Sequence, residues 1–184
     1  MSGLPRSGTS MMMKMLEAGG LEVLTDHIRE PNADNPQGYY EFERVKKLPE
    51  GDTAWIEEAE GKVVKIISAL LMHLPPEYTY KVLFMRRHMD EILASQRQML
   101  IRRGEDTNKA SDADMARLFE KHLREVHAWL DKQPYLTYLD IDYNAMLQDP
   151  RPHLAHIAPF LGRALNLEEM IATVDPTLYR QRRR

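Results

Sequence analysis

Apolar residues recur at helical spacing in four stretches of the chain, and this spacing predicts helices. The stretches cover residues 8–18, 89–103, 111–132 and 149–162. Glycines follow or close the first, second and fourth, while Ser111 and Asp114 form a capping box at the start of the third. A shorter helix is expected at 52–61. The third helix should bury an apolar stripe made of Met115, Leu118, Phe119, Val126 and Leu130.

Runs of β-branched and apolar residues predict strands at 62–68, 80–87 and 135–143. The segment 21–40 contains Pro, Asn and Gly at intervals and should be mostly loop. Strands that alternate with helices favour a parallel sheet with helices on both faces. The sequence therefore predicts an α/β fold of three layers with a central, mostly parallel sheet. In such folds ligands bind at the carboxyl ends of the strands.

The stretch "GLPRSGTS", just before the first helix, is typical of a loop that holds a phosphate. Backbone N–H groups at a helix start point at the phosphate, Gly8 allows a close approach, and Thr9 and Ser10 supply hydroxyls. Arg6 adds a forked cation that can bind two oxygens together. Such a loop needs a strand before it, yet four residues precede Pro5. Either that strand is very short or the chain begins further upstream.

Composition narrows the classes of function. The length suits one domain spanning residues 1–184, and the net charge of −3 argues against a nucleic-acid partner. The absence of cysteine excludes disulfides and thiolate sites and fits a cytoplasmic protein. No apolar run approaches the roughly 20 residues that a membrane span needs, and the start of the chain does not resemble a signal peptide.

"GLPRSGTS" followed by "MMMKML" resembles the 5′-phosphosulfate loop of the sulfotransferases, which use 3′-phosphoadenosine 5′-phosphosulfate (PAPS). It is most similar to the bacterial and tyrosylprotein-type branches, where arginine replaces a lysine. The resemblance implies a P-loop-like fold, PAPS as the donor, 3′-phosphoadenosine 5′-phosphate (PAP) as the product, and no required metal. The loop residues that it assigns to the donor are Pro5, Arg6, Ser7, Gly8, Thr9 and Ser10.

A second motif, "KVLFMRRHMDEILASQ", strengthens the resemblance. In the family, an arginine at a strand end and a serine eight residues later on the next helix grip the 3′-phosphate of PAPS. Arg87 and Ser95 have this spacing and context. Lys65, in "KVVKIIS", matches the region of a second family lysine that contacts the bridging oxygen; alternatively, it is a strand-end lysine that reaches solvent.

The acceptor implied by the resemblance is a hydroxyl or amine on a small molecule, a peptide or a glycan, and "NPQGYYE" at 35–41 resembles a family loop near the acceptor pocket. The cytosolic branch places its basic histidine just after the strand lysine, but residues 66–68 are not basic. The tyrosylprotein branch takes a carboxylate from the loop after the first helix, where this chain has "TDHIRE". His27 is the first candidate for the base because histidine titrates near neutrality, with Asp26 and Glu30 as alternatives.

Two other functions remain open from the sequence. A P-loop kinase or NTPase would need a lysine where Gly8 stands, although Asp140 or Asp142 could serve as its acidic residue. The second open function is a module that binds the nucleotide but transfers no group. The histidines show no accompanying acidic pattern, so no metal site is expected. The oligomeric state is open.

Overall fold

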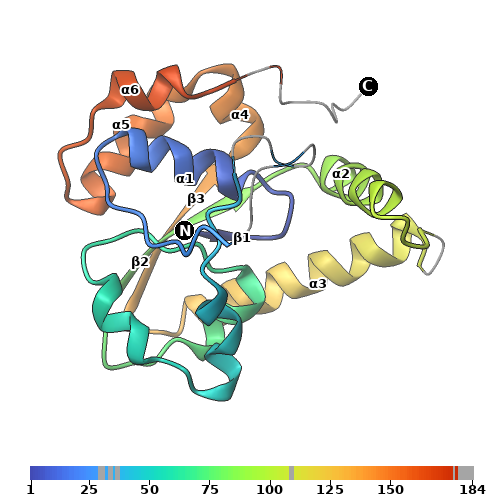
Figure 1. Ribbon diagram of the computed structural model, residues 1–184, viewed down its shortest axis with the longest axis horizontal. Helices are drawn as coiled ribbons and strands as arrows, with labels where there is room; N and C mark the ends of the chain where they lie inside the picture. The colour runs from blue at the N-terminus through green and yellow to red at the C-terminus, as the bar shows by residue number, and fades with distance from the viewer. Residues whose placement is uncertain (29–31, 33–34, 36–37, 108–109, 176, 178–184) are drawn as a thin grey trace.

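The centre of the protein is a three-stranded parallel sheet, seen in a computed structural model that describes residues 1–28, 32, 35, 38–107, 110–175 and 177 (Figure 1). Its strands are β1 (Ser2–Gly3), β2 (Tyr80–Arg86) and β3 (Leu136–Asp142), in that spatial order. β2 pairs with β3 over its whole length, whereas β1 adds two pairs, Ser2 with Phe84 and Gly3 with Met85. The predictions of strands at 80–87 and 135–143 are confirmed.

The four main predicted helices are present as α1 (Thr9–Ala18), α2 (Met89–Arg102), α3 (Asp112–Leu130) and α5 (Pro150–Leu161). Ser111 caps α3 as expected, since its hydroxyl accepts the N–H of Asp114 at 3.1 Å. Leu118, however, is 57% exposed, so its place in the buried stripe of α3 was predicted wrongly; Val126 and Leu130 make the buried side. The remaining helices are α4 (Tyr143–Gln148), α6 (Leu167–Ala172) and the 3-10 helices η1 (Glu43–Glu50), η2 (Ala54–Ala59) and η3 (Ser68–His73).

Two apolar clusters cover the two faces of the sheet, because successive side chains of a strand point to opposite faces. Leu83 and Met85 of β2 pack with residues of α1, α4, α5 and α6. Val82 and Phe84 pack with residues of α3 and of the 3-10 helices. Figure 1 shows α1, α5 and α6 on one side of the strands and α3 on the other. The three-layer α/β fold is therefore confirmed. None of the helices in the described residues is both long and apolar enough to cross a membrane.

The strand predicted at 62–68 does not form as such. Residues 64–67 have no regular secondary structure, Val63 makes an isolated bridge with Val23, and Ser68 already begins η3. The segment nevertheless makes ladder-like hydrogen bonds with Met1, from Met1 N to the Val64 carbonyl and from Ile66 N to the Met1 carbonyl, both at 2.9 Å. β1 is too short to offer the continuous partner that a strand of this length requires.

Candidate functional site

The loop between β1 and α1 is a tight turn held by Ser7. The Ser7 hydroxyl and N–H both donate to the carbonyl of Leu4, at 2.7 and 3.2 Å, and Ser7 is buried. Arg6, just before it, has φ of 70°, in the left-handed region that residues with side chains rarely adopt. Backbone strain of this kind is found preferentially at ligand-binding sites. Ser7 thus shapes the loop, and its neighbours on either side face the cleft described below.

Position 8 requires glycine for two reasons: its backbone angle and a neighbouring aromatic ring. Its φ is 97°, and an added Cβ would lie 2.2 Å from Cδ2 of Tyr143. Gly20 has a similar φ of 96° but nothing within 4 Å of such a Cβ, so a positive φ alone does not create the steric demand found at Gly8. Gly8 is also the N-cap of α1 and makes no side-chain cap hydrogen bond, which leaves the first amides of the helix without a side-chain acceptor from the cap.

The structure brings Arg6, Arg87 and Ser95 together, although they come from three elements. Arg6 Nε donates to the Ser95 hydroxyl at 2.9 Å across 89 residues of sequence. Arg87 Nη1 donates to the Arg6 carbonyl at 3.0 Å. The contact arises because β1 and β2 are parallel neighbours, so the loop after β1 and the start of α2 lie at the same edge of the sheet.

Arg87, which was predicted to bind a phosphate, also makes several contacts within the protein. Its Nε donates to Glu91 Oε2 at 2.9 Å, and both side chains are almost fully buried, 8% and 1% exposed. Asn144 Nδ2 donates to the same Glu91 oxygen at 2.9 Å, and the Arg87 guanidinium lies 4.6 Å from the centre of the Tyr143 ring. Burial raises the pKa of the Tyr143 phenol. Arg87 therefore also joins the loop between β1 and α1 to α2 and α4.

Lys65 reaches the first turn of α1 from the extended segment before η3. Its Nζ donates to the Tyr39 carbonyl and lies 3.4 Å from the Ser10 hydroxyl. Asn35 Nδ2 donates to the same hydroxyl at 2.8 Å. The sequence predicted Lys65 as a second cation near the loop, and in the structure Lys65 lies beside the first turn of α1.

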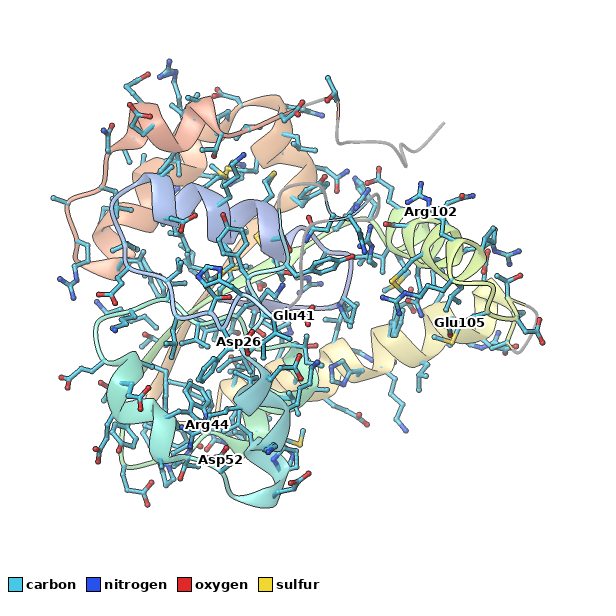
Figure 2. The ribbon with its side chains drawn as sticks, viewed as in Figure 1. Asp26, Glu41, Arg44, Asp52, Arg102 and Glu105 are labelled. Atoms are coloured by element: carbon cyan, nitrogen blue, oxygen red, sulfur yellow. The ribbon has the colours of Figure 1, made fainter. Side chains whose placement is uncertain are left out.

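These residues line one cleft of about 450 Å³ at the carboxyl edge of the sheet. Its lining from the loop before α1 and the first turn of that helix consists of Pro5, Arg6, Gly8, Thr9 and Ser10. Figure 2 shows two labelled residues of its lining, Glu41 near the middle of the molecule and Arg102 on α2. Among the described residues that line the cleft, six are cationic and one is a carboxylate: Arg6, Lys46, Lys65, Arg87, Arg102 and Arg103 against Glu41. Three of these cations, Lys46, Arg87 and Arg103, also pair with carboxylates. The lining still carries an excess of positive charge, which suits a ligand with negative charges.

Of the residues predicted as the base, Asp26 and His27 are described by the structure and do not lie in this lining. Asp26 uses its carboxylate to accept the N–H groups of Ile28 at 3.0 Å and Glu43 at 2.5 Å, which makes it a support for the loop. His27 is exposed on the same loop, and Glu30 falls outside the described residues. Sequence reasoning missed Glu41, which lines the cleft with a side chain 21% exposed. It lies at the end of "NPQGYYE", the stretch that resembles a family loop near the acceptor pocket.

The lining fits a nucleotide donor carrying a phosphosulfate and a further phosphate. It combines a glycine that permits close approach, the start of a helix ten residues long and an excess of cations. In the described part of the chain, no group of three or more His, Asp or Glu side chains is placed to hold a metal ion. Cationic side chains of the lining and the start of α1 offer positive charge to a ligand in the cleft.

Comparisons with known proteins identify the fold and the family. The sulfotransferase domain of the Synechococcus PCC 7002 olefin synthase has a similar fold, with a TM-score of 0.55 and 16% identity, over 99% of this chain and 86% of that one. The sulfotransferase domain from the curacin biosynthetic pathway is also similar, with a TM-score of 0.51 and 13% identity, over 95% and 76%. No curated protein matches the sequence. The family model "Sulfotransferase family" matches residues 40–166, more than half of the chain, and the protein therefore belongs to the sulfotransferase family.

Proposed function

We propose that the protein transfers a sulfuryl group from PAPS to a hydroxyl or amine acceptor, with the roles divided among the residues of the cleft. The observation that carries the proposal is the contact between Arg6 and Ser95 at 2.9 Å. It joins the loop suited to a phosphosulfate and the helix residue suited to a 3′-phosphate in one cleft. A single donor that carries both groups can therefore span them.

Arg6, Lys65 and the first amides of α1 surround the part of the cleft nearest the loop. Bound PAPS would supply an electrophilic sulfur with PAP as the leaving group. In this arrangement Arg6 and the amides neutralise the negative charge that builds on the leaving 5′-phosphate. Lys65 stands next to Ser10 and is the cation suited to the bridging oxygen. Arg87 and Ser95 hold the 3′-phosphate end, with Arg87 also supporting the loop through the Arg6 carbonyl.

Glu41 is the carboxylate suited to act as the base. As the acceptor oxygen or nitrogen forms its bond to sulfur, the bond from sulfur to the bridging oxygen breaks and that oxygen leaves with PAP, while the acceptor loses a proton. Among the described residues of the lining, Glu41 is the one carboxylate, and its Oε2 lies 3.8 Å from Lys46 Nζ. The cleft lining also contains the apolar residues Phe42, Val45 and Ile67, of which Phe42 follows Glu41 directly in the sequence. This side of the cleft is therefore where we place the acceptor.

Binding of PAP without metal tests the donor assignment. With EDTA present and PAP at about 100 times its Kd, the free energy of unfolding should rise by about 2.7 kcal/mol, which raises the melting temperature by about 5–10 °C. ATP under the same conditions should give no comparable shift. Stabilisation by ATP that requires magnesium, with none by PAP, would indicate a kinase or NTPase instead. Binding of PAP without transfer of labelled sulfate from PAPS to any acceptor class would indicate a binding module.

Glu41→Gln is expected to lower turnover about 100-fold or more with an acceptor found in that labelled-PAPS screen. The amide keeps the shape of the side chain but cannot take the proton, so the affinity for PAP should be unchanged. His27→Ala is the matched control, because His27 lies on a neighbouring loop outside the cleft lining. Initial rates and PAP titrations check both variants. An inactive His27→Ala beside an active Glu41→Gln would return the role of base to His27.

A further inference from the structure

The cleft has an apolar side that the residues assigned to the donor do not use. Phe42 and Ile67 are the N-caps of η1 and η3, and Val45 and Leu70 lie in the first turns of the same two 3-10 helices. All four residues line the cleft. η1 and η3 are in contact with each other, so the four residues form one surface, which we call the apolar wall.

The core of the protein holds most of the apolar wall in place. Val45 is 4% exposed and belongs to a buried apolar cluster, against which Phe42 and Leu70 also pack. The Phe42 ring meets the Trp55 ring edge-on, with the ring centroids 5.5 Å apart. Ile67, in contrast, is 41% exposed. A ligand that covers Ile67 would remove apolar surface from water, which favours binding.

Ile67 shares one face of its segment with Lys65. Val64 and Ile66 are buried, whereas Lys65 and Ile67 line the cleft, which is the alternation expected of an extended chain. Two positions along such a chain span about 7 Å. In the proposed reaction Lys65 contacts the bridging oxygen next to the sulfur. The body of an acceptor molecule that reacts at this sulfur therefore lies within reach of Ile67.

The polar side chains that flank the apolar wall in the sequence are already paired. Two polar residues of the lining, Glu41 and Lys46, flank Phe42 and Val45. Glu41 Oε2 lies 3.8 Å from Lys46 Nζ, which also pairs with Glu43 at 2.6 Å. A sugar would place several hydroxyls against the wall, and a hydroxyl that is buried without a hydrogen-bond partner is unfavourable. An alkyl or aromatic body makes no such demand.

We propose that the acceptor is a hydrophobic alcohol, whose hydroxyl lies at Glu41 and whose alkyl or aromatic body lies along the apolar wall, with Ile67 selecting for that body. The inference rests on the proposed function, since it concerns the acceptor of the same transfer. The hydroxyl oxygen bonds to sulfur, the bridging oxygen leaves with PAP, and the hydroxyl proton passes to Glu41, so the product is a sulfate monoester. An alkylamine fits less well, because it is protonated near neutral pH and adds positive charge to a lining that has an excess of it.

Primary alcohols from ethanol to octan-1-ol test the preference, with labelled PAPS as the donor. Each added methylene should raise kcat/KM about 2- to 4-fold until the wall is covered, because burial of apolar surface is favourable. Ile67→Ser should lower kcat/KM for octan-1-ol about 10-fold and for ethanol much less, with the affinity for PAP changed less than about 2-fold. Ile67→Leu keeps the apolar surface and should retain the dependence on chain length.

Met72→Ser is the matched control for Ile67→Ser. Met72 lies on the 3-10 helix that Ile67 caps and is 49% exposed, but it does not line the cleft. Its replacement should leave kcat/KM unchanged for every alcohol of the series. Equal losses with octan-1-ol for Met72→Ser and Ile67→Ser would overturn the role of Ile67.

Calorimetry gives a readout that needs no turnover. Octan-1-ol should bind the protein saturated with PAP, with a negative change in heat capacity that Ile67→Ser makes smaller. The absence of such binding, or a kcat/KM that does not depend on chain length, would overturn the inference.

The acceptor that reacts best separates this inference from the proposed function. A higher kcat/KM with sorbitol or 6-hydroxyhexanoate than with hexan-1-ol would overturn the inference and leave the proposed function in place. Transfer to a peptide or a glycan but to none of the alcohols would do the same. No transfer from PAPS to any acceptor class would overturn both.

Discussion

Arg6→Ala is expected to lower sulfuryl transfer by at least about 100-fold while leaving the fold intact. Arg6 lines the cleft beside the first turn of α1, where the proposed reaction would build charge. Loss of a fixed cation at such a position raises the barrier by about 3 kcal/mol or more. Alanine has the same backbone restriction as arginine at φ of 70°, so the turn itself should keep its geometry. Turnover with saturating PAPS and a thermal melting curve measure the two parts of this expectation.

Arg97→Ala provides a matched control for Arg6→Ala. Arg97 lies on α2 but is 43% exposed and pairs with Asp112 at 3.0 Å, outside the cleft lining. Its removal should change turnover less than about 2-fold, as expected of a surface ion pair. Arg6→Lys keeps the charge but loses the forked geometry, and should give an intermediate rate. If Arg6→Ala keeps normal turnover with a normal melting curve, Arg6 has no part in the transfer.

Arg87→Ala is expected to have the largest effect on stability. It leaves the carboxylate of Glu91, which is 1% exposed, without its cation and with Asn144 as a remaining donor. Breaking a buried ion pair from one side costs about 3–5 kcal/mol. For a chain of this size the melting temperature should fall by about 10 °C. Thermal and urea unfolding, both without nucleotide, give the measurement.

Arg86→Ala is a control that separates the loss of the buried ion pair from a general loss of positive charge. Arg86 and its partner Asp140 are 43% and 42% exposed and 3.5 Å apart, so Arg86→Ala should cost at most about 1 kcal/mol. The double variant Arg87→Met with Glu91→Leu should recover much of the stability, because it removes both charges together. Similar losses for Arg86→Ala and Arg87→Ala would show that the buried pair with Glu91 does not stabilise the protein.

The sequence by itself determined the features that depend on residues close together along the chain. Helical spacing and caps predicted α1, α2, α3 and α5, and β-branched runs predicted β2 and β3. The order of Pro, Arg, Gly and hydroxyl residues predicted a tight loop that opens a helix, which the structure has between β1 and α1; that this loop holds a phosphate stays a prediction. The spacing of Arg87 and Ser95 predicted that they lie at one strand-to-helix junction, because eight residues across such a junction allow few arrangements.

The tertiary structure decided which distant side chains meet and which of them reach the cleft. The bond from Arg6 to Ser95 spans 89 residues, and the bond from Asn144 to Glu91 spans 53, so no local pattern could reveal either. The candidates for the base illustrate the same limit: Asp26 and His27 have suitable chemistry, but the fold places Glu41, and neither of these two, in the cleft lining. Residues 62–68 have the composition of a strand, yet a strand also needs a partner of matching length. Pairing of this kind is a property of two segments, and it is settled only when the chain folds and brings them side by side.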